Sequence, residues 1–260
     1  MDYLENYYSS YDEEGRLLSR HGQVEYLTTM KYIHEILGGD KKKKILEAGA
    51  GTGRYSVTLA KEGYSVDAVE LTKHNLKILL GKLDGTENIR AVQGNALDLS
   101  RYGDNSFDVT LVLGPMYHLC SEEDKKQALR EAVRVTKSGG YILAAYCMNE
   151  MVVIQEVFLN GSLERCLERG MLTEDFHCVS KPEDLFEMVR VEDIFALTKE
   201  LPVTREKLIA TDGAASYLRS YIDGLDDKLF DYWLKFHFAT CERQDLIGAT
   251  NHSLDILRKE

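Results

Sequence analysis

A glycine-rich segment, Glu47-Ala48-Gly49-Ala50-Gly51-Thr52-Gly53, is the part of the sequence best suited to holding a ligand. Glycines at this spacing permit a tight turn and let the backbone approach a bound molecule closely. A helix that starts after the turn would direct unpaired N–H groups at that molecule. The dinucleotide fingerprint G-x-G-x-x-G, counted from Gly49, needs a glycine at position 54, where this chain has Arg54. The spacing therefore disfavours a nicotinamide or flavin cofactor.

Two carboxylates flank this loop. Glu47 would repel a pyrophosphate, but it suits a ligand with a cationic amino-acid portion. Glu70 ends the next apolar run, where an acid meets a ribose diol in nucleotide-binding sheets. The two acids together favour a nucleoside that carries a positively charged amino acid. The alternative for Glu70 is an ordinary solvated acid at the end of a strand.

The segment 114–119, Gly-Pro-Met-Tyr-His-Leu, is the second place where chemistry is expected. His118 could act as a base for a phenol, thiol or amine, because histidine titrates near neutral pH. Tyr117 could line the pocket. The alternatives are a histidine that only packs or hydrogen-bonds at a turn, and a tyrosine that belongs to the core.

Other histidines have weaker patterns. His237 and Trp233 share a helix face that is more typical of a core, and His177 beside Cys178 is too isolated to predict a metal site. Asn251 and His252 precede the last expected strand and could reach a substrate. The sequence contains five cysteines without C-x-x-C spacing, which predicts neither a disulfide framework nor a zinc site.

These residues lie at the boundaries of alternating strands and helices. Apolar runs predict strands over 44–48, 65–70, 88–92, 107–113 and 141–147, with Gly139-Gly140 as the turn into the fifth. Helices are expected over 55–62, 72–82 and 121–136, the second capped by Thr72 and the third by Ser121. Short links between such elements predict an α/β fold with a doubly wound, mostly parallel, seven-stranded sheet. Ligands of such sheets bind at the carboxyl ends of the strands.

Outside this region the alternation is lost. Helices are predicted over 23–37, 152–168, 192–199 and 226–242, and strands over 206–211 and 254–257. Residues 176–191 are ambiguous, with Pro182 as a helix start. We expect a single domain over 1–260, with a helical insertion at about 149–190.

Composition narrows the function classes. The formal net charge is −11, which argues against a nucleic-acid partner, and the lysines at 41–44 are read as a solvated loop. No apolar run approaches the roughly 20 residues of a membrane span. The start of the chain lacks the pattern of a signal peptide. We therefore expect a cytoplasmic protein with no membrane partner, whose oligomeric state the sequence does not indicate.

The chain resembles the class I S-adenosylmethionine-dependent methyltransferases. The likeness rests on residues 45–53 and continues, in order, through 69–70, 94–96, 107–109 and 135–140, which together cover roughly 43–147. The resemblance implies a Rossmann-like fold, S-adenosylmethionine as cofactor and S-adenosylhomocysteine as product. Many relatives carry aspartate where this chain has Asn95, but an amide oxygen can still accept a bond from the adenine amino group.

The resemblance also implies roles for individual positions. A segment before the glycine loop closes over the cofactor in many relatives, so residues 1–38 would form a lid to which Tyr11, Arg16 and His21 could belong; a mobile, partly solvated tail is the alternative. The implied cofactor contacts are Glu47, Gly49, Ala50 and Gly51 along the loop, Glu70 at the ribose, Leu71, Asn95 and Ala96 at the adenine, and Leu113 and Gly114 at the methionine end.

The expected reaction is methyl transfer to a small molecule by direct displacement. Oxygen, nitrogen, sulfur and carbon acceptors all stay open, and a base is needed only if the acceptor must lose a proton. The alternatives are an RNA or protein methyltransferase and a non-catalytic S-adenosylmethionine-binding regulatory protein. Residues 114–117 read Gly-Pro-Met-Tyr, which lacks the asparagine-proline-proline-tyrosine pattern of enzymes that methylate amide or base nitrogens.

Overall fold

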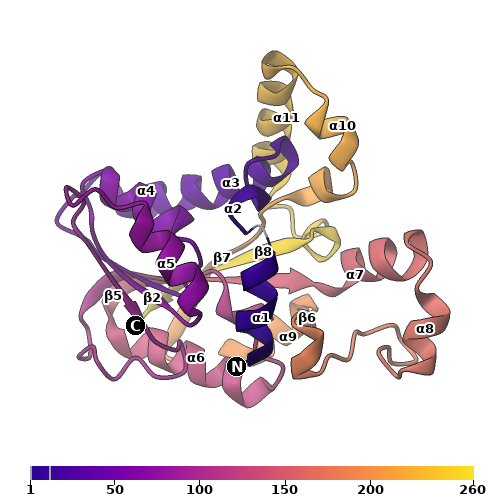
Figure 1. Ribbon diagram of the computed structural model, residues 1–260, viewed down its shortest axis with the longest axis horizontal. Helices are drawn as coiled ribbons and strands as arrows, with labels where there is room; N and C mark the ends of the chain where they lie inside the picture. The colour runs from indigo at the N-terminus through magenta and orange to yellow at the C-terminus, as the bar shows by residue number, and fades with distance from the viewer. Residues whose placement is uncertain (1, 12) are drawn as a thin grey trace.

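A twisted eight-stranded sheet forms the centre of the molecule in the computed structural model, which describes residues 2–11 and 13–260 (Figure 1). The strand order is β3-β2-β1-β4-β5-β8-β7, and the short β6 pairs with β5 off this path. Strands β1 to β5 run parallel, whereas β8 is antiparallel to both of its neighbours. The predicted doubly wound, mostly parallel sheet is confirmed, but it has eight strands rather than the seven expected, because the short β6 adds one. The strands are β1 Lys44–Ala48, β2 Ser65–Glu70, β3 Ile89–Gln93, β4 Phe107–Val112, β5 Thr136–Met148, β6 Met188–Val189, β7 Val203–Ala210 and β8 His252–Lys259.

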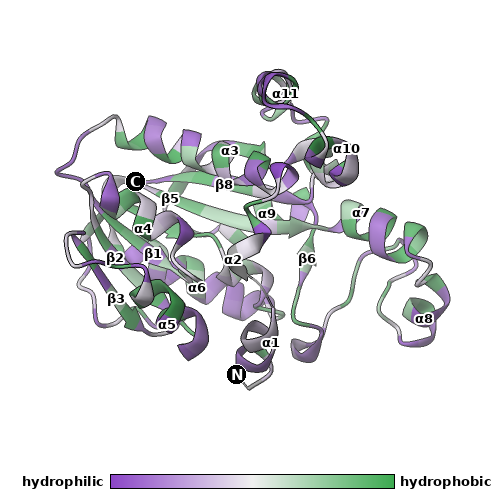
Figure 2. Cartoon of the chain, turned by 45° about the horizontal axis from the view of Figure 1, so that its top comes forward, coloured by the Kyte–Doolittle hydropathy of each residue, from purple (hydrophilic) through white to green (hydrophobic). Residues whose placement is uncertain are grey.

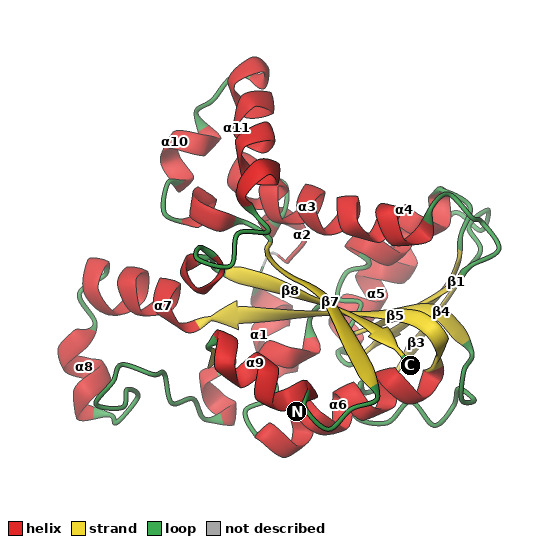
Figure 3. Ribbon diagram, turned by 180° about the vertical axis from the view of Figure 1, so that it is seen from behind, coloured by secondary structure: helices red, strands yellow, loops and turns green. Residues whose placement is uncertain are grey.

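Helices cover both faces of the sheet. Helices α3 and α4 contribute to the core on one face, while α6 and α9 pack on the other (Figure 3). Hydrophobic residues are concentrated on the strands, and the surface helices alternate between hydrophobic and hydrophilic residues (Figure 2). The helices are α1 Asp2–Ser10, α2 Glu13–Arg16, α3 Arg20–Leu37, α4 Arg54–Lys61, α5 Lys73–Gly81, α6 Glu122–Val135, α7 Asn149–Val152, α8 Leu163–Glu168, α9 Val191–Thr198, α10 Arg219–Asp223 and α11 Asp227–Thr240.

Local signals fix several element ends as predicted. The Thr72 hydroxyl accepts from the Asn75 N–H at the start of α5, and Ser121 accepts from Asp124 N–H at the start of α6. Gly38 ends α3 in the left-handed conformation, with φ 59°.

The start of β5 differs in part from the prediction. The strand begins at Thr136, so Gly139 and Gly140 lie inside it, but Gly139 has φ 76° and regular pairing with β4 resumes at Tyr141. A Cβ atom on Gly140 would lie 2.7 Å from the carbonyl oxygen of Asp108. Glycine is therefore needed because the backbone of β5 approaches β4 closely, near the register shift between Phe107 and Val109.

The helix predicted over 152–168 is also wrong. It is divided into α7, a π-helical continuation over Val153–Leu159, and α8. Gly161, with φ 68°, interrupts it. Pro182 starts only a 3₁₀ turn, Pro182–Asp184.

Two helical arms extend beyond the sheet. Helices α10 and α11 form one and α7 and α8 form the other (Figure 1). Within the described residues, no helix has both the length and the apolar character to cross a membrane.

Candidate active site

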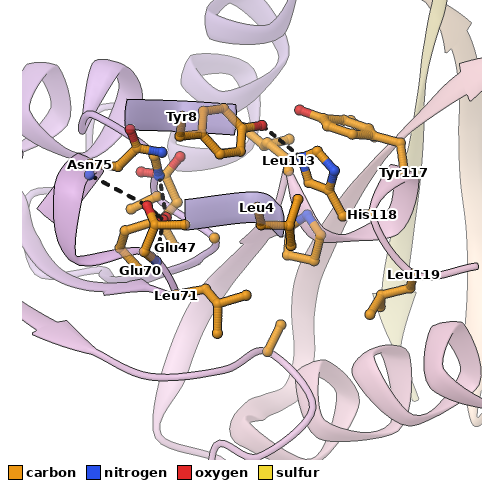
Figure 4. Close-up of a pocket in the computed structure, with 18 of the residues that line it drawn as sticks. Leu4, Tyr8, Glu47, Glu70, Leu71, Asn75, Leu113, Tyr117, His118 and Leu119 are labelled. Atoms are coloured by element: carbon orange, nitrogen blue, oxygen red, sulfur yellow. Dashed lines mark hydrogen bonds between the residues drawn. The ribbon is translucent and has the colours of Figure 1, made fainter. Parts of the chain in front are cut away.

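A cavity of about 510 Å³ lies at the carboxyl ends of β1, β2 and β4, next to the glycine loop. Every cofactor position expected from the sequence lines this cavity, as do Tyr117 and His118. Helix α1 adds Leu4 and Tyr8 to the lining (Figure 4). The sheet thus brings residues from distant parts of the sequence to one edge, as the parallel topology predicts.

The glycine loop is held tightly against its neighbours. Gly49 has φ 78°, and a Cβ atom there would lie 2.5 Å from Cδ of Pro115. The N–H groups of Gly49 and Ala50 donate to the carbonyl of Val69 at 2.8 and 3.0 Å. Gly51 has φ 54°, and its Cβ position meets no atom within 4 Å. The loop therefore leaves open space at Gly51, where a ligand can approach the backbone.

Glu47 is buried beside this loop. Burial raises the pKa of Glu47 to about 8, with a further increase from the charge of Glu70, although hydrogen bonds from Ser56 oppose the shift. Both the N–H and the hydroxyl of Ser56 donate to one oxygen, Oε2. A cationic ligand group next to Glu47 would favour its ionised form. The position therefore fits the methionine ammonium that the sequence resemblance implies.

Glu70 joins the loop to the next helix. Its Oε2 accepts from the Gly51 N–H at 2.7 Å, while Oε1 accepts from the N–H and hydroxyl of Thr72 at 2.9 and 2.8 Å. A carboxylate has about four acceptor positions. One position on Oε2 is left for a ligand hydroxyl, so Glu70 fits a ribose diol without losing its bonds to the protein.

The remaining cofactor positions are on neighbouring loops. Leu71 follows β2, and Leu113 and Gly114 follow β4. Asn95 accepts from the N–H of Leu97 at 3.0 Å through its side-chain oxygen, which fixes the loop that also carries the buried Ala96.

His118 is held at both ring nitrogens. Its Nδ1 lies 2.7 Å from the carbonyl oxygen of Leu185, and its Nε2 lies 2.7 Å from the hydroxyl of Tyr8 (Figure 4). Burial lowers the pKa of His118, although the bond to Leu185 opposes this shift. The ring also packs against Tyr117 and Phe186, with centroids 4.9 and 5.1 Å away.

The structure separates the expected lid residues. Arg16 lines the cavity and pairs with Glu25 at 2.8 Å. Among the described residues that line the cavity, Tyr11 and His21 do not appear. Tyr11 stacks on Tyr7 at 5.0 Å, and His21 bonds to Asp223 of α10 at 2.8 Å, so both side chains face other parts of the protein.

A charged cluster lines another part of the cavity. His252 Nδ1 lies 3.1 Å from Asp212 and 3.4 Å from Glu25. Burial lowers the pKa of His252, but the charges of Glu25 and Cys147 and the bonds to Asp212 and Cys147 raise it. Burial raises the pKa of Asp212, but the bonds from His252 and Thr250 bring it down to about 2. With Arg16 on Glu25, two positive and two negative groups compensate one another.

Several site residues were not predicted. Tyr3, Leu4, Tyr8, Glu25, Thr29, Tyr55 and Thr211 all line the cavity. Leu4 and Tyr8 are spaced i, i+4 on one face of α1, which is a helical signal that the sequence does contain. His237 is buried, in agreement with its expected place in the core.

Comparison with known proteins finds methyltransferases. A family model described as "Methyltransferase domain" matches residues 46–144. The ubiquinone biosynthesis O-methyltransferase of Nitrosomonas europaea is 25% identical over 203 residues, which are 74% of this chain and 82% of the relative. The demethylmenaquinone methyltransferase of Clavibacter sepedonicus is 32% identical over 137 residues, 52% of each protein. This chain therefore spans about half the length of the second relative.

A solved structure extends the likeness to the whole chain. The S-adenosylmethionine-dependent methyltransferase of Thermotoga maritima, described as a possible histamine N-methyltransferase, has a TM-score of 0.61 at 18% identity and covers 100% of this chain and 99% of its own. At this identity the likeness shows the fold. The matched domain and the curated relatives identify the chain as an S-adenosylmethionine-dependent methyltransferase, with S-adenosylmethionine as its cofactor.

Proposed function

We propose that this methyltransferase acts on a small molecule bound in the same cavity as the cofactor. The main support is the continuity of the cavity. One volume of about 510 Å³ includes the glycine loop and Glu70, and it extends to Tyr117, Thr211 and His252. The cofactor positions gather along the loop and the adjoining strand ends, so the region around Thr211 and His252 offers space for an acceptor.

The chain's residues have three tasks in this reaction. When bound, S-adenosylmethionine supplies an activated methyl group on a sulfonium. Glu47 binds the ammonium and Glu70 binds the ribose hydroxyls, while Leu71 and Ala96 contact the adenine. Leu113 and Gly114 position the methionine end. Alignment of the acceptor for direct displacement and exclusion of water then supply the rate acceleration.

Two segments would cover the site. Helix α1 contributes Tyr3, Leu4 and Tyr8 to the lining, which supports the lid over residues 1–38. The insertion at about 149–190 bonds to His118 through the carbonyl of Leu185, which supports a cap that shapes the acceptor region. Both segments belong, in this proposal, to a single domain over 1–260.

A small acceptor is favoured over a macromolecule. The net charge of −11 disfavours RNA, and a cavity roofed by α1 suits a molecule that can be enclosed. The cavity lined by Leu113 and Gly114 continues to Tyr117 and His118, which favours catalysis over a purely regulatory binding protein. The free cysteines, Cys120, Cys147, Cys166, Cys178 and Cys241, support a reducing, cytoplasmic location.

Ligand binding and product release test this proposal together. S-adenosylhomocysteine at 100 times its Kd should stabilise the fold by about 2.7 kcal/mol, seen as a rise in Tm. A panel of phenols, thiols and amines should then identify acceptors by the release of S-adenosylhomocysteine from S-adenosylmethionine. The absence of any Tm shift at millimolar ligand would contradict the cofactor site. Binding without turnover of any acceptor would favour the regulatory alternative.

A further inference from the structure

Three separate segments of the chain meet at His118. Tyr8 comes from α1, His118 from the loop after β4, and Leu185 from the insertion. The insertion is anchored there by the Glu187 N–H, which donates to the Tyr117 carbonyl at 2.8 Å. An arrangement assembled from three distant segments indicates that the ring orientation of His118 is held in place.

The bonds fix the tautomer of His118. A carbonyl oxygen can only accept, so the Nδ1 atom facing Leu185 must carry the proton. In the neutral ring, Nε2 is then the acceptor, and the Tyr8 hydroxyl donates to it at 2.7 Å. Because burial lowers the pKa of His118, the ring is neutral at physiological pH and retains a basic nitrogen.

Leu185 adopts an unusual backbone conformation at this contact. Its φ is 70° and its ψ is −39°, outside the regions that leucine ordinarily occupies. Such strain costs on the order of 1–3 kcal/mol and persists only where the surrounding structure enforces it. The strained residue is the one whose carbonyl selects the His118 tautomer.

We propose that Tyr8 and His118 form a proton relay, with Tyr8 as the catalytic residue that contacts the acceptor and Leu185 as the positioning residue. The acceptor class is a weakly acidic hydroxyl, such as a phenol or enol. This inference rests on the proposed function and adds the class of acceptor to it. Tyr8, Tyr117 and His118 all line the cavity, so an aromatic acceptor would lie among aromatic side chains.

The proton transfers balance as follows. The acceptor oxygen forms a bond to the methyl carbon, the carbon–sulfur bond breaks and its electron pair stays on sulfur. The acceptor proton moves to the Tyr8 oxygen as the Tyr8 proton moves to Nε2 of His118. The resulting imidazolium keeps its Nδ1–H bond to Leu185 and later releases one proton to solvent.

The relay explains why a hydroxyl is favoured. A phenol acceptor and the Tyr8 side chain carry the same kind of hydroxyl, so the exchange of a proton between them is nearly balanced. A thiol is partly ionised at neutral pH without help. An amine attacks through its lone pair and gains little from early removal of a proton.

Two phenols of different acidity, used as methyl acceptors, test the relay. At pH 8, 4-nitrophenol is largely ionised, whereas 4-methylphenol is not. Tyr8→Phe and His118→Asn should each lower kcat/KM for 4-methylphenol by about 100-fold or more, the usual contribution of a base, while 4-nitrophenol changes little. Asparagine retains a donor for the Leu185 carbonyl, so His118→Asn removes mainly the base. Tyr232→Phe, on exposed α11, is the matched control.

Two further features separate a relay from a structural role. The double variant should be no slower than the slower single variant, because the two groups act as a unit. The wild-type rate should be flat near neutral pH and fall in acid as His118 becomes protonated, and this acidic limb should vanish in His118→Asn. Glu187 and Lys125 lie near this loop and pair at 3.4 Å. Both are present in the wild type and in His118→Asn, so they cannot account for the loss of the acidic limb. Additive effects, or equal losses with both phenols, would overturn the relay.

Nitrogen-15 NMR of the histidine rings gives a result that does not depend on turnover. His118 should appear at pH 7.5 as the neutral Nδ1–H tautomer, and Tyr8→Phe should shift its Nε2 signal. An Nε2–H tautomer or an imidazolium would overturn the relay even if methyl transfer occurs. Turnover of amines or thiols alone would overturn the acceptor class. Failure of all turnover despite bound S-adenosylhomocysteine would count against the proposed function, and the NMR result would still decide the relay.

Discussion

Glu70 shows how one residue supports both the fold and the ligand site. Its carboxylate accepts from Gly51 at 2.7 Å and from Thr72 at 2.9 Å, which fixes the glycine loop relative to the start of α5. One acceptor position of the same group is left for the ribose hydroxyl that we propose it binds. A substitution at Glu70 should therefore affect loop geometry and cofactor affinity together.

We predict that Glu70→Gln weakens S-adenosylhomocysteine binding by about 10- to 100-fold. The substitution replaces charge-assisted hydrogen bonds, each worth about 1.5–3 kcal/mol. It also places the amide NH₂ group of glutamine against the N–H of Gly51 or of Thr72, where two donors would face each other. Isothermal titration calorimetry measures the change directly. Glu206→Gln, at an exposed position of β7, is the control and should leave Kd unchanged. Wild-type affinity in Glu70→Gln would remove Glu70 from the ribose site.

The sequence indicates the expected cofactor positions more directly than the proposed acceptor residues. Glu47, Gly51 and Glu70 stand in one continuous motif region, where spacing alone restricts the ligand. Tyr8 and Leu185 act through contacts across more than 60 positions of sequence. Such contacts depend on how α1 and the insertion pack, and local pattern does not encode this packing.

At the scale of elements, short parallel strands were predicted well because both faces of each are buried. The errors lie where the backbone departs from regular geometry. Gly140 permits the close approach of β5 to β4. In the sequence, the pair Gly139-Gly140 predicts a turn instead. Gly161 interrupts a hydrophobic periodicity that otherwise continues, so a single helix was expected. A glycine signal has several structural meanings, and the tertiary contact decides between them.

Helix α1 is fastened to α5 by one side chain. The Glu5 carboxylate accepts from the N–H groups of Lys73 and His74 at 2.8 and 3.0 Å, and Thr72 caps the next donor. A negative group at a helix N-terminus contributes about 0.3–1 kcal/mol through the helix dipole. Glu5 therefore holds α1, which carries Tyr8, against the start of α5.

We predict that Glu5→Gln accelerates release of S-adenosylhomocysteine while the fold stays intact. Loss of the charge weakens the contact between α1 and α5, so the lid opens more often. Stopped-flow displacement measures the dissociation rate, and hydrogen exchange in residues 2–10 should increase. Glu35→Gln, on the exposed surface of α3, should change neither quantity. An unaltered dissociation rate in Glu5→Gln would show that α1 does not gate the cofactor.

At the scale of the whole molecule, the order of the strands joins the last strand of the chain to the parallel part of the sheet. The last strand, β8, lies between β5 and β7, with Leu143 opposite Ile256 and Ile209 opposite Leu254. Strand β5, the last of the five parallel strands β1 to β5, therefore shares hydrogen bonds directly with β8. The helical insertion leaves the sheet after β5 and returns to it through β6.

This connectivity predicts a single cooperative unfolding transition. Calorimetric and van't Hoff enthalpies should agree, because neither half of the sheet can keep its core without β8. Saturating S-adenosylhomocysteine should move the whole transition to higher temperature, since the ligand binds the native state alone. Leu254→Ala, which removes a fully buried side chain of β8, should cost about 2–5 kcal/mol and lower the Tm of the same single transition. Leu229→Ala, at a half-exposed position of α11, is the matched control and should change the Tm far less. Two separate transitions, with only one of them sensitive to S-adenosylhomocysteine or to Leu254→Ala, would show that the sheet and the helical arms unfold independently.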